Sequence, residues 1–342
     1  MTAPLLAQPV GVRRAGAEDR EAIAAYVRAH PDSTPFHLPE WSEAVARGCG
    51  QRAVTLIAER GDGSLAGVLP LTHVRSPLFG QALVSCGFAV DGGPLGAVEE
   101  LASGARALAE ELGCPTIELR GGAAPAGWDL DAGSYLGFAR DLATDDEAEL
   151  LAIPRKQRAE VRKALAANLT VEVGRDANTH YAIYAESVRN LGTPVFPRAL
   201  FRAVLDTMDA DVLTVRCGHA AVASVLSLYW RGTVYPYWGG GTHAARALRA
   251  NDRMYFALMA HARARGCTRF DFGRSKVGTG AAAFKKNWGF AGEPLSYASW
   301  SAGPKREVNP LNPKYALMVR AWQRLPLPVA NLIGPWISRG LG

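Results

Sequence analysis

The densest group of residues that could do chemistry lies between positions 271 and 290. Asp271 ends a run expected to be a strand, a glycine-containing stretch follows, and Lys285 and Lys286 lie on the next expected helix. Attack of an amine on an ester or thioester makes an oxyanion, which a nearby ammonium or N–H group can stabilise. Lys285 is the candidate for that role and Lys286 the next, because adjacent helical residues point in different directions and one alone can face a reacting group. Asp271 could orient the acceptor amine or accept its proton.

Other interpretations of the same residues are structural. Paired lysines usually form a solvated helix face, and an acid at a strand end usually caps a turn or pairs with a cation. Arg274 and Lys276 follow Asp271 closely and could hold a phosphate or carboxylate, with Ser275 between them as part of the same predicted substrate-binding group.

A second candidate region surrounds Pro236. Proline cannot donate to a sheet ladder, so the run Tyr235-Pro236-Tyr237-Trp238 marks an edge, a bulge or a splay in its strand. A splayed strand exposes main-chain N–H groups that could hold an acyl carbonyl or a peptide backbone. Tyr235, Tyr237 and Trp238 are therefore predicted to bind substrate, and the alternative is a simple edge strand with core aromatics.

The residues after this strand predict a donor site. Gly239, Gly240 and Gly241 open an expected loop over residues 239–250, and Asn251 can cap the helix that follows. A helix N-terminus offers free N–H groups and partial positive charge, and small residues before it let the backbone approach a phosphate. These four residues are the predicted donor-binding set. No strict GxGxxG or Walker pattern is present, so a flexible connector is the alternative.

Two further groups are weaker candidates for substrate binding. Arg155 and Lys156 begin a basic helical run that could meet an anionic substrate between domains, although a solvated face is the ordinary outcome. His37 and Trp41 lie in a proline-rich aromatic segment that could line the cleft from the first domain or form a packed loop.

The elements that must position these residues recur in the same order in both halves of the chain. Each half is expected to contain a hairpin, a third strand, a glycine-containing segment, a helix and a further strand. In the first half, the expected ranges are 53–59, 65–74, 82–88, 98–112 and 116–119, with another strand near 134–142. In the second half, the two hairpin strands are expected at 212–216 and 220–229 and the third strand at 233–238. The helix is expected from residue 251 and the last strand at 268–272.

A short match supports duplication. Gly113-Cys114 and Gly266-Cys267 each end a helix and precede a strand that carries an acidic residue. This order of elements resembles that of the acetyltransferase-like (GNAT) fold. We therefore expect an α/β (α+β) protein with two tandem GNAT-like domains, each a mixed, mainly antiparallel sheet flanked by helices. The predicted divisions are residues 1–145, residues 146–303 with the active site, and a C-terminal tail at 304–342.

Four motifs together resemble the FemAB family of acyl- and aminoacyltransferases, and within it the FemAB-like proteins associated with exosortase/PEP-CTERM systems. The likeness covers roughly residues 10 to 300, and its most specific motif is the last of the four. The motifs are Phe36-His37-Leu38-Pro39-Glu40-Trp41, Pro154-Arg155-Lys156-Gln157-Arg158, Asp271-Phe272-Gly273-Arg274-Ser275 and Phe284-Lys285-Lys286-Asn287-Trp288-Gly289-Phe290.

The resemblance implies transfer of an acyl or aminoacyl group onto an amine. In well-studied members of the family the donor is an aminoacyl-tRNA and the acceptor a peptidoglycan precursor, and the lysine of their Phe-Lys motif, which matches Lys285 here, lies near the reacting ester. This chain lacks an obvious long helical-hairpin arm, which some tRNA-using members carry. An acyl-CoA or other thioester is therefore as good a candidate donor as an aminoacyl-tRNA, and no tightly bound cofactor is expected. The predicted enzyme is an amide-forming acyltransferase acting on a cell-envelope or exopolysaccharide precursor. The alternatives are an acyl-CoA-dependent N-acetyltransferase for a small amine and a non-enzymatic module that binds an anionic polymer.

Composition is consistent with two folded domains. The 342 residues are 48% apolar and carry a formal charge of +6, which suits a phosphate, nucleotide, RNA or lipid head group without requiring one. The five cysteines have no CxxC spacing and read as reduced thiols, and no metal site is expected. No signal peptide or membrane span is evident, so a cytoplasmic location is expected.

The tail at 304–342 combines apolar, proline and arginine residues. It is too short and too broken by proline to cross a bilayer. It could lie on the inner membrane surface, where tryptophan and arginine favour the interface, or it could pack on its own second domain.

Overall fold

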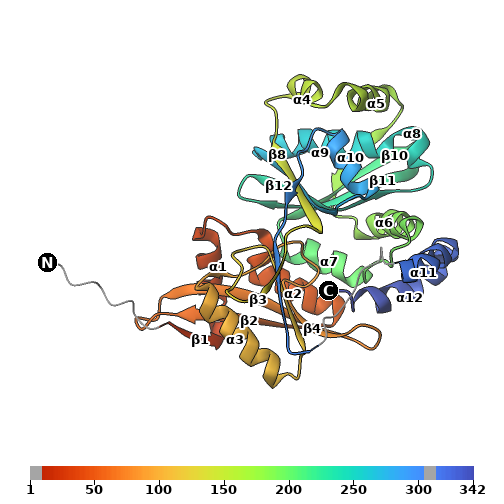
Figure 1. Cartoon of the computed structure of the whole chain (residues 1–342). Helices are drawn as coiled ribbons and strands as arrows, with labels where there is room; N and C mark the ends of the chain where they lie inside the picture. Colours follow the sequence, from red (N-terminus) through yellow and green to blue (C-terminus); the bar gives the residue numbers. More distant parts are fainter. Residues whose placement is uncertain (1–9, 304–312) are drawn as a thin grey trace. The chain divides into compact units, whose positions relative to one another are not determined.

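The computed structural model describes residues 10–303 and 313–342, and the chain divides into two compact units (Figure 1). The N-terminal unit comprises the described residues before Ala132, the segment that starts at Ser296, and Gly340–Gly342. The C-terminal unit comprises Ala132–Leu295 and the described helices up to Arg339.

The N-terminal unit is built on a sheet with strand order β1-β2-β3-β4-β6-β15-β7, and β5 pairs with β3. The helix α3 covers β1, β2, β3 and β6, and α1 and α2 contact β3. The strands are β1 (Gly11–Arg14), β2 (Arg52–Glu59), β3 (Leu65–Ser76), β4 (Gly80–Ser85), β5 (Leu95–Gly96), β6 (Thr116–Arg120), β7 (Asp129–Asp131) and β15 (Tyr297–Ser301). The helices are α1 (Arg20–Ala29), α2 (Pro39–Cys49) and α3 (Val98–Glu111), with 3-10 turns at Ala17–Asp19 and Pro35–His37.

The C-terminal unit has a sheet with strand order β14-β8-β13-β12-β11-β10-β9. The strands are β8 (Tyr135–Asp141), β9 (Thr170–Gly174), β10 (Ala210–Cys217), β11 (Ala220–Trp230), β12 (Thr233–Gly241), β13 (Arg269–Lys276) and β14 (Glu293–Pro294). The helices are α4 (Asp146–Ala152), α5 (Arg155–Ala166), α6 (Ala177–Leu191), α7 (Arg198–Thr207), α8 (Ala245–Leu248), α9 (Ala250–Ala264), α10 (Gly280–Asn287), α11 (Pro313–Arg324) and α12 (Leu327–Ser338).

The two sheets share one plan, as the prediction of tandem GNAT-like domains requires. In each, an antiparallel series of strands ends in a parallel pair, β4 with β6 and β12 with β13, and an antiparallel strand follows. In the N-terminal unit that following strand comes from outside the unit's main run of sequence, whereas in the C-terminal unit it is the first strand of the unit's own run. The strand β15 pairs with β6 in the N-terminal unit, and β8 pairs with β13 in the C-terminal unit.

The sheets to which β8 and β15 belong change the predicted domain limits. A single boundary near residue 145 was predicted, but β8 belongs to the second sheet, so the division falls between Asp131 and Ala132. The predicted end of the second domain at 303 differs for the same reason, because β15 returns to the first sheet. Both β8 and β15 lie beside the open edge of a parallel pair, where their backbone groups form hydrogen bonds.

Helices cover both faces of the C-terminal sheet. The helix α9 buries Met254, Leu258 and Met259 in a core that includes Val225 of β11. On the opposite face, His180 of α6 bonds Ser224, the neighbouring residue of β11. Adjacent strand residues point to opposite faces, so β11 is buried on both sides.

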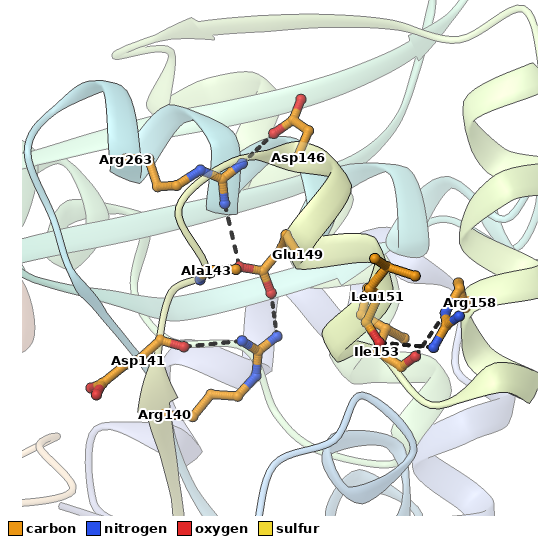
Figure 2. Close-up of polar contacts among 9 residues, drawn as sticks. All are labelled: Arg140, Asp141, Ala143, Asp146, Glu149, Leu151, Ile153, Arg158 and Arg263. Atoms are coloured by element: carbon orange, nitrogen blue, oxygen red, sulfur yellow. Dashed lines mark hydrogen bonds and ion pairs between the residues drawn. The ribbon is translucent and has the colours of Figure 1, made fainter.

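A buried acid fixes α4 to the sheet (Figure 2). Glu149 is fully buried, and its carboxylate pairs with Arg140 of β8 and, at 3.3 Å, with Arg263 of α9. The backbone N–H of Ala143 donates to the same carboxylate at 2.9 Å. Pro154 separates α4 from α5, and there Arg158 donates to carbonyl oxygens at the end of α4.

The C-terminal helices pack on their own unit. The helices α11 and α12 contact α6, and Gln323 of α11 donates to the carbonyl of Asn190 at 3.2 Å. The predicted tail at 304–342 lies partly outside the described residues, which resume at 313. Among the described residues, no helix is both long enough and apolar enough to span a bilayer.

Candidate active site

A cavity of about 710 Å³ lies in the C-terminal unit around the end of β12. The strand β12 pairs with β13 at Thr233–Arg269 and Val234–Phe270, and the cavity adjoins β12 beyond those pairs. Side chains from both faces of the sheet reach it, since α6 and α9 both contribute. The lining residues are Ser187, Asn190, Leu191, Gly239, Gly240, Gly241, Thr242, His243, Ala244, Arg246, Ala247, Asn251, Tyr255 and Phe284.

The three predicted donor-binding glycines belong to β12, not to a loop. They pair with Val225, Ser224 and Ala223 of β11, which corrects the expected loop over residues 239–250. A Cβ on Gly239 would lie 2.8 Å from the Tyr255 hydroxyl, and one on Gly240 would lie 2.5 Å from Ser187 Oγ. The glycines are thus required because cavity-lining side chains lie directly against the strand.

Asn251 lines the same cavity, but it does not cap α9. The helix begins at Ala250 after Arg249, whose φ of 55° is left-handed, and no side chain caps it. Asn251 Oδ1 is buried and has no hydrogen-bond partner among the described residues. It lies 2.7 Å from the position that a Cβ on Gly241 would occupy. A buried amide without a partner is costly, so this side chain is suited to a ligand group.

Tyr255 contributes a hydroxyl to the cavity. Burial raises the pKa of Tyr255, and burial and the nearby Tyr255 raise the pKa of Tyr184. Both phenols therefore remain protonated near neutral pH and can donate hydrogen bonds. The Tyr255 ring packs edge-on against Phe272 of β13 at 4.8 Å between centroids, which fixes its direction.

The segment around Pro236 contains a bulge within a central strand. Leu226 faces Trp238 and Ser227 faces Pro236, so Tyr237 is the extra residue on β12. Because β12 lies between β11 and β13, the alternative of an edge strand is wrong. Trp238 is buried against Phe196 and Phe201 of the same unit and does not line the cavity, whereas Tyr235 and Tyr237 are half-buried.

Lys285 and Asp271 meet at a second irregularity, in β13. Register shifts between Asp271 and Arg274, and Gly273 there has a left-handed φ of 64°. Asp271 Oδ1 accepts a hydrogen bond from Gly273 N at 2.8 Å. Lys285 Nζ donates to the carbonyl oxygens of Gly273 and Arg274 at 3.1 and 2.9 Å. Lys285 thus donates hydrogen bonds to the carbonyl groups at the register shift between β13 and β8.

The environment of Lys285 makes its charge sensitive to pH. The side chain is only 9% exposed and lies beside the rings of Phe138 and Phe272. Burial lowers the pKa of Lys285 to about 8, Asp271 opposes this shift and Arg274 adds to it. Neither Lys285 nor Asp271 lines the cavity, whereas Phe284, the neighbour of Lys285, does. The predicted pair is together, but beside the cavity wall.

The other predicted substrate residues are more scattered. Arg274 lies over the ring of Tyr135 at 4.8 Å, and Ser275 is buried in β13. Lys276 is half-buried, and its carbonyl accepts a hydrogen bond from Thr279, the N-cap of α10. Lys286 is exposed on α10, and Arg155 and Lys156 are exposed on α5. None of these residues lines the cavity at β12.

His37 and Trp41 lie in the core of the N-terminal unit. Trp41 is fully buried and donates to the carbonyl of Gly87 at 3.1 Å. Thr34 N lies 3.0 Å from His37 Nδ1, so Nε2 carries the proton and donates to the carbonyl of Gly93 at 2.9 Å. Burial lowers the pKa of His37 to about 4. The structure therefore favours the packed loop.

Sequence reasoning missed several cavity residues. Ser187, Asn190 and Leu191 line it at spacings of three and four on α6. Polar residues at helical spacing beside the apolar residues of α6 were the available signal. The signal at Tyr255 was its hydroxyl, because a phenol on an otherwise apolar helix face can reach a cavity.

Comparison with known proteins agrees with this architecture. Residues 155–286 match the Acetyltransferase (GNAT) domain family. The crystal structure of FemX is similar at a TM-score of 0.62 and 16% identity, over 84% of this chain and 96% of that one. A tandem GNAT protein from the clavulanic acid biosynthesis pathway gives 0.54 and 12%, over 87% and 100%.

A third similar structure is the C-terminal domain of a putative lysylphosphatidylglycerol synthetase from Agrobacterium fabrum. Its TM-score is 0.56 at 14% identity, over 83% of this chain and 92% of that one. No curated protein matches the sequence.

Residues 155–286, most of the C-terminal unit, therefore match a GNAT domain. The chain has the tandem GNAT-like fold of the FemX structure, and the predicted fold class is confirmed. The association with exosortase/PEP-CTERM systems stays a prediction.

Proposed function

We propose that the C-terminal unit transfers an acyl or aminoacyl group to an amino group of a cell-envelope or exopolysaccharide precursor. The observation that carries the proposal is the cavity beside β12, beyond its last pair with β13. There the backbone of a parallel strand has left its partner, and polar groups from α6, α8 and α9 surround the space. The FemAB-like motifs and the FemX fold support an amine of an envelope precursor as the acceptor.

The proposed reaction forms an amide in one transfer. The acceptor nitrogen attacks the acyl carbonyl, the tetrahedral oxyanion collapses, and the bond to the donor oxygen or sulfur breaks. The attacking amine loses a proton, and the leaving group gains one. Main-chain N–H groups near the bulge at Tyr237 would stabilise the oxyanion. The Tyr255 hydroxyl, which stays protonated, would donate to the leaving group.

The proposal keeps the roles predicted from the sequence, Lys285 stabilising the oxyanion and Asp271 contacting the acceptor amine. The Lys285 ammonium would add positive potential near the oxyanion through its remaining N–H, since its printed bonds go to two carbonyls. Asp271 would hold or accept the proton of the acceptor amine. Asp271 acts from β13, the strand that separates from β12, and Lys285 acts from α10, where its side chain bonds carbonyl groups of β13.

The donor is an acyl-CoA or an aminoacyl-tRNA. Both carry an activated acyl group next to phosphates, and Arg246 and Asn251 in the cavity suit such a group. The match to the acetyltransferase domain favours acyl-CoA, with a small amine as an alternative acceptor, whereas the FemX fold suits either donor. Thermal shift separates them, because a ligand that binds the native state raises the melting temperature.

The experiment fills the cavity without disturbing the core. Ala247 is exposed and lines the cavity, so Ala247→Trp should block the donor, whereas Ala159→Trp on the exposed face of α5 is the matched control. Acetyl-CoA and an aminoacyl-tRNA mixture would be offered with amine acceptors, and amide products detected by mass spectrometry. We expect A247W to lower turnover at least about tenfold and to reduce the donor-induced thermal shift, while A159W does neither. Equal activity in both variants, or no acylation with either donor, would overturn the proposal.

A further inference from the structure

The helix α12 buries one narrow face against its own unit. Ala330, Gly334 and Ser338, spaced four residues apart, are all buried. Ser338 Oγ donates to the carbonyl of Val195 at 2.8 Å, and a Cβ on Gly334 would lie 3.2 Å from Val195 N. Small residues thus let α12 lie close to the segment after α6.

The other face of α12 is apolar and exposed. Val329, Leu332, Ile333 and Trp336 are 42%, 79%, 37% and 48% exposed. Their spacing of three, four and seven residues puts them on one side of the helix. A surface helix normally turns polar residues outward, so this face is unlike that of a helix packed only on its own protein.

The neighbouring helix extends the apolar surface. Leu317 and Met318 of α11 are 77% and 65% exposed. Six of the thirteen exposed large hydrophobic side chains in the described ranges lie on α11 and α12. We name these six the tail face: Leu317, Met318, Val329, Leu332, Ile333 and Trp336. Such a concentration marks an interaction surface, not scattered surface residues.

The sequence of the two tail helices carries charges of one sign. From residue 308 to the last residue given, the sequence has no Asp or Glu but has Lys314, Arg320, Arg324 and Arg339. Arg320 and Arg324 are exposed on α11. An apolar helix face with tryptophan and flanking arginines matches the boundary between acyl chains and anionic head groups.

We propose that the tail face binds the surface of a bilayer that contains anionic phospholipid. The helices α11 and α12 lie in the interface, and none of the described helices can cross it. The apolar side chains enter the acyl boundary, and the arginines contact lipid phosphates. Each attraction alone is weak, and the two together give reversible binding.

This surface is joined to the cavity through α6. Asn190 lines the cavity, and its carbonyl accepts the bond from Gln323 of α11. Leu191, 71% exposed, lines the cavity as well. The contact would therefore hold the cavity close to the membrane, where a lipid-linked acceptor resides. The binding itself does not depend on the proposed reaction.

The test is co-sedimentation of the full chain with two kinds of vesicle, phosphatidylcholine alone and phosphatidylcholine with 30% phosphatidylglycerol. We expect the wild-type chain to bind the anionic vesicles and to be released by high salt. The double variant Leu332→Ser with Trp336→Ser should weaken this binding at least about tenfold. The matched control Leu151→Ser with Val173→Ser, two exposed apolar residues of the same unit, should bind as wild type.

Three results would overturn the proposal. If the wild-type chain binds neither vesicle, or the control variant loses binding equally, the tail face is not a lipid surface. If sedimentation shows a dimer in solution that L332S/W336S dissociates, a second copy covers the face instead. Unchanged melting temperature and unchanged transfer to a soluble acceptor in L332S/W336S separate a failure here from a failure of the proposed function.

Discussion

Lys285 holds its ammonium against the carbonyls of Gly273 and Arg274, and this contact gives it both a structural and an electrostatic effect. The Phe-Lys motif identified the residue, and its neighbour in sequence, Lys286, is the exposed one. The two carbonyl partners were not predictable, because they arise from an irregularity of β13 that no side-chain pattern reveals. The structural and the electrostatic effect of Lys285 can be measured separately, because stability and activity should respond differently to pH.

Stability should rise at alkaline pH because of this lysine. The native pKa is about 8, below the ordinary value of 10.5, so between these values the unfolded chain holds a proton that the native chain has released. The free energy of unfolding, taken relative to Lys285→Met, should therefore increase from pH 8 to 10.5 by about 3 kcal/mol. Denaturant titrations across that window measure the difference.

Activity should move in the opposite direction. If the ammonium stabilises an oxyanion, turnover per folded molecule falls as pH rises through about 8, and K285M is slow at every pH. Lys286→Met is the matched control and should keep the wild-type profile. A purely structural lysine would instead leave the profile of K285M parallel to that of wild type, which would remove Lys285 from the mechanism.

At the scale of elements, the helices and most long strands followed from periodicity and punctuation. The break at Pro154, the stripe of α9 and the hairpin of β10 with β11 were all predictable from apolar spacing and tight turns. The short strands β7, β14 and β15 were not predicted, because two to five residues carry too little pattern. The contacts that lock elements together were also invisible, since Arg140, Glu149 and Arg263 are far apart in sequence.

The Glu149 cluster provides the prediction at this scale. Glu149→Ala leaves Arg140 and Arg263, whose side chains are 17% and 13% exposed, without their shared carboxylate. Breaking a buried pair in this way should cost the C-terminal unit roughly 3–5 kcal/mol. Asp146→Ala removes a 63% exposed partner of the same Arg263 and should cost less than about 1 kcal/mol. Chemical denaturation compares the two, and similar small losses would show that the cluster contributes little.

The whole molecule has two sheets, and one strand of the first sheet, β15, follows the second sheet in sequence. The tandem order of elements was predictable, since the same succession recurs in both halves. The return of β15 was not, because local sequence says nothing of a sheet partner more than a hundred residues away. The consequence is that residues 297–301, at the far end of the C-terminal unit's sequence, complete the first sheet.

A proline in β15 should therefore weaken the N-terminal sheet. Ala298 pairs with Leu119 of β6 and Leu130 of β7, and a proline there removes a ladder donor in a strand with neighbours on both sides. In Ala298→Pro, hydrogen exchange should speed up in β6, although the substitution is distant in sequence, and should change little in β12. Leu136→Pro in β8 is the reciprocal variant and should speed up exchange in β13 rather than in β6. If A298P instead speeds up hydrogen exchange in β13 and L136P speeds it up in β6, β15 and β8 do not belong to the sheets assigned here.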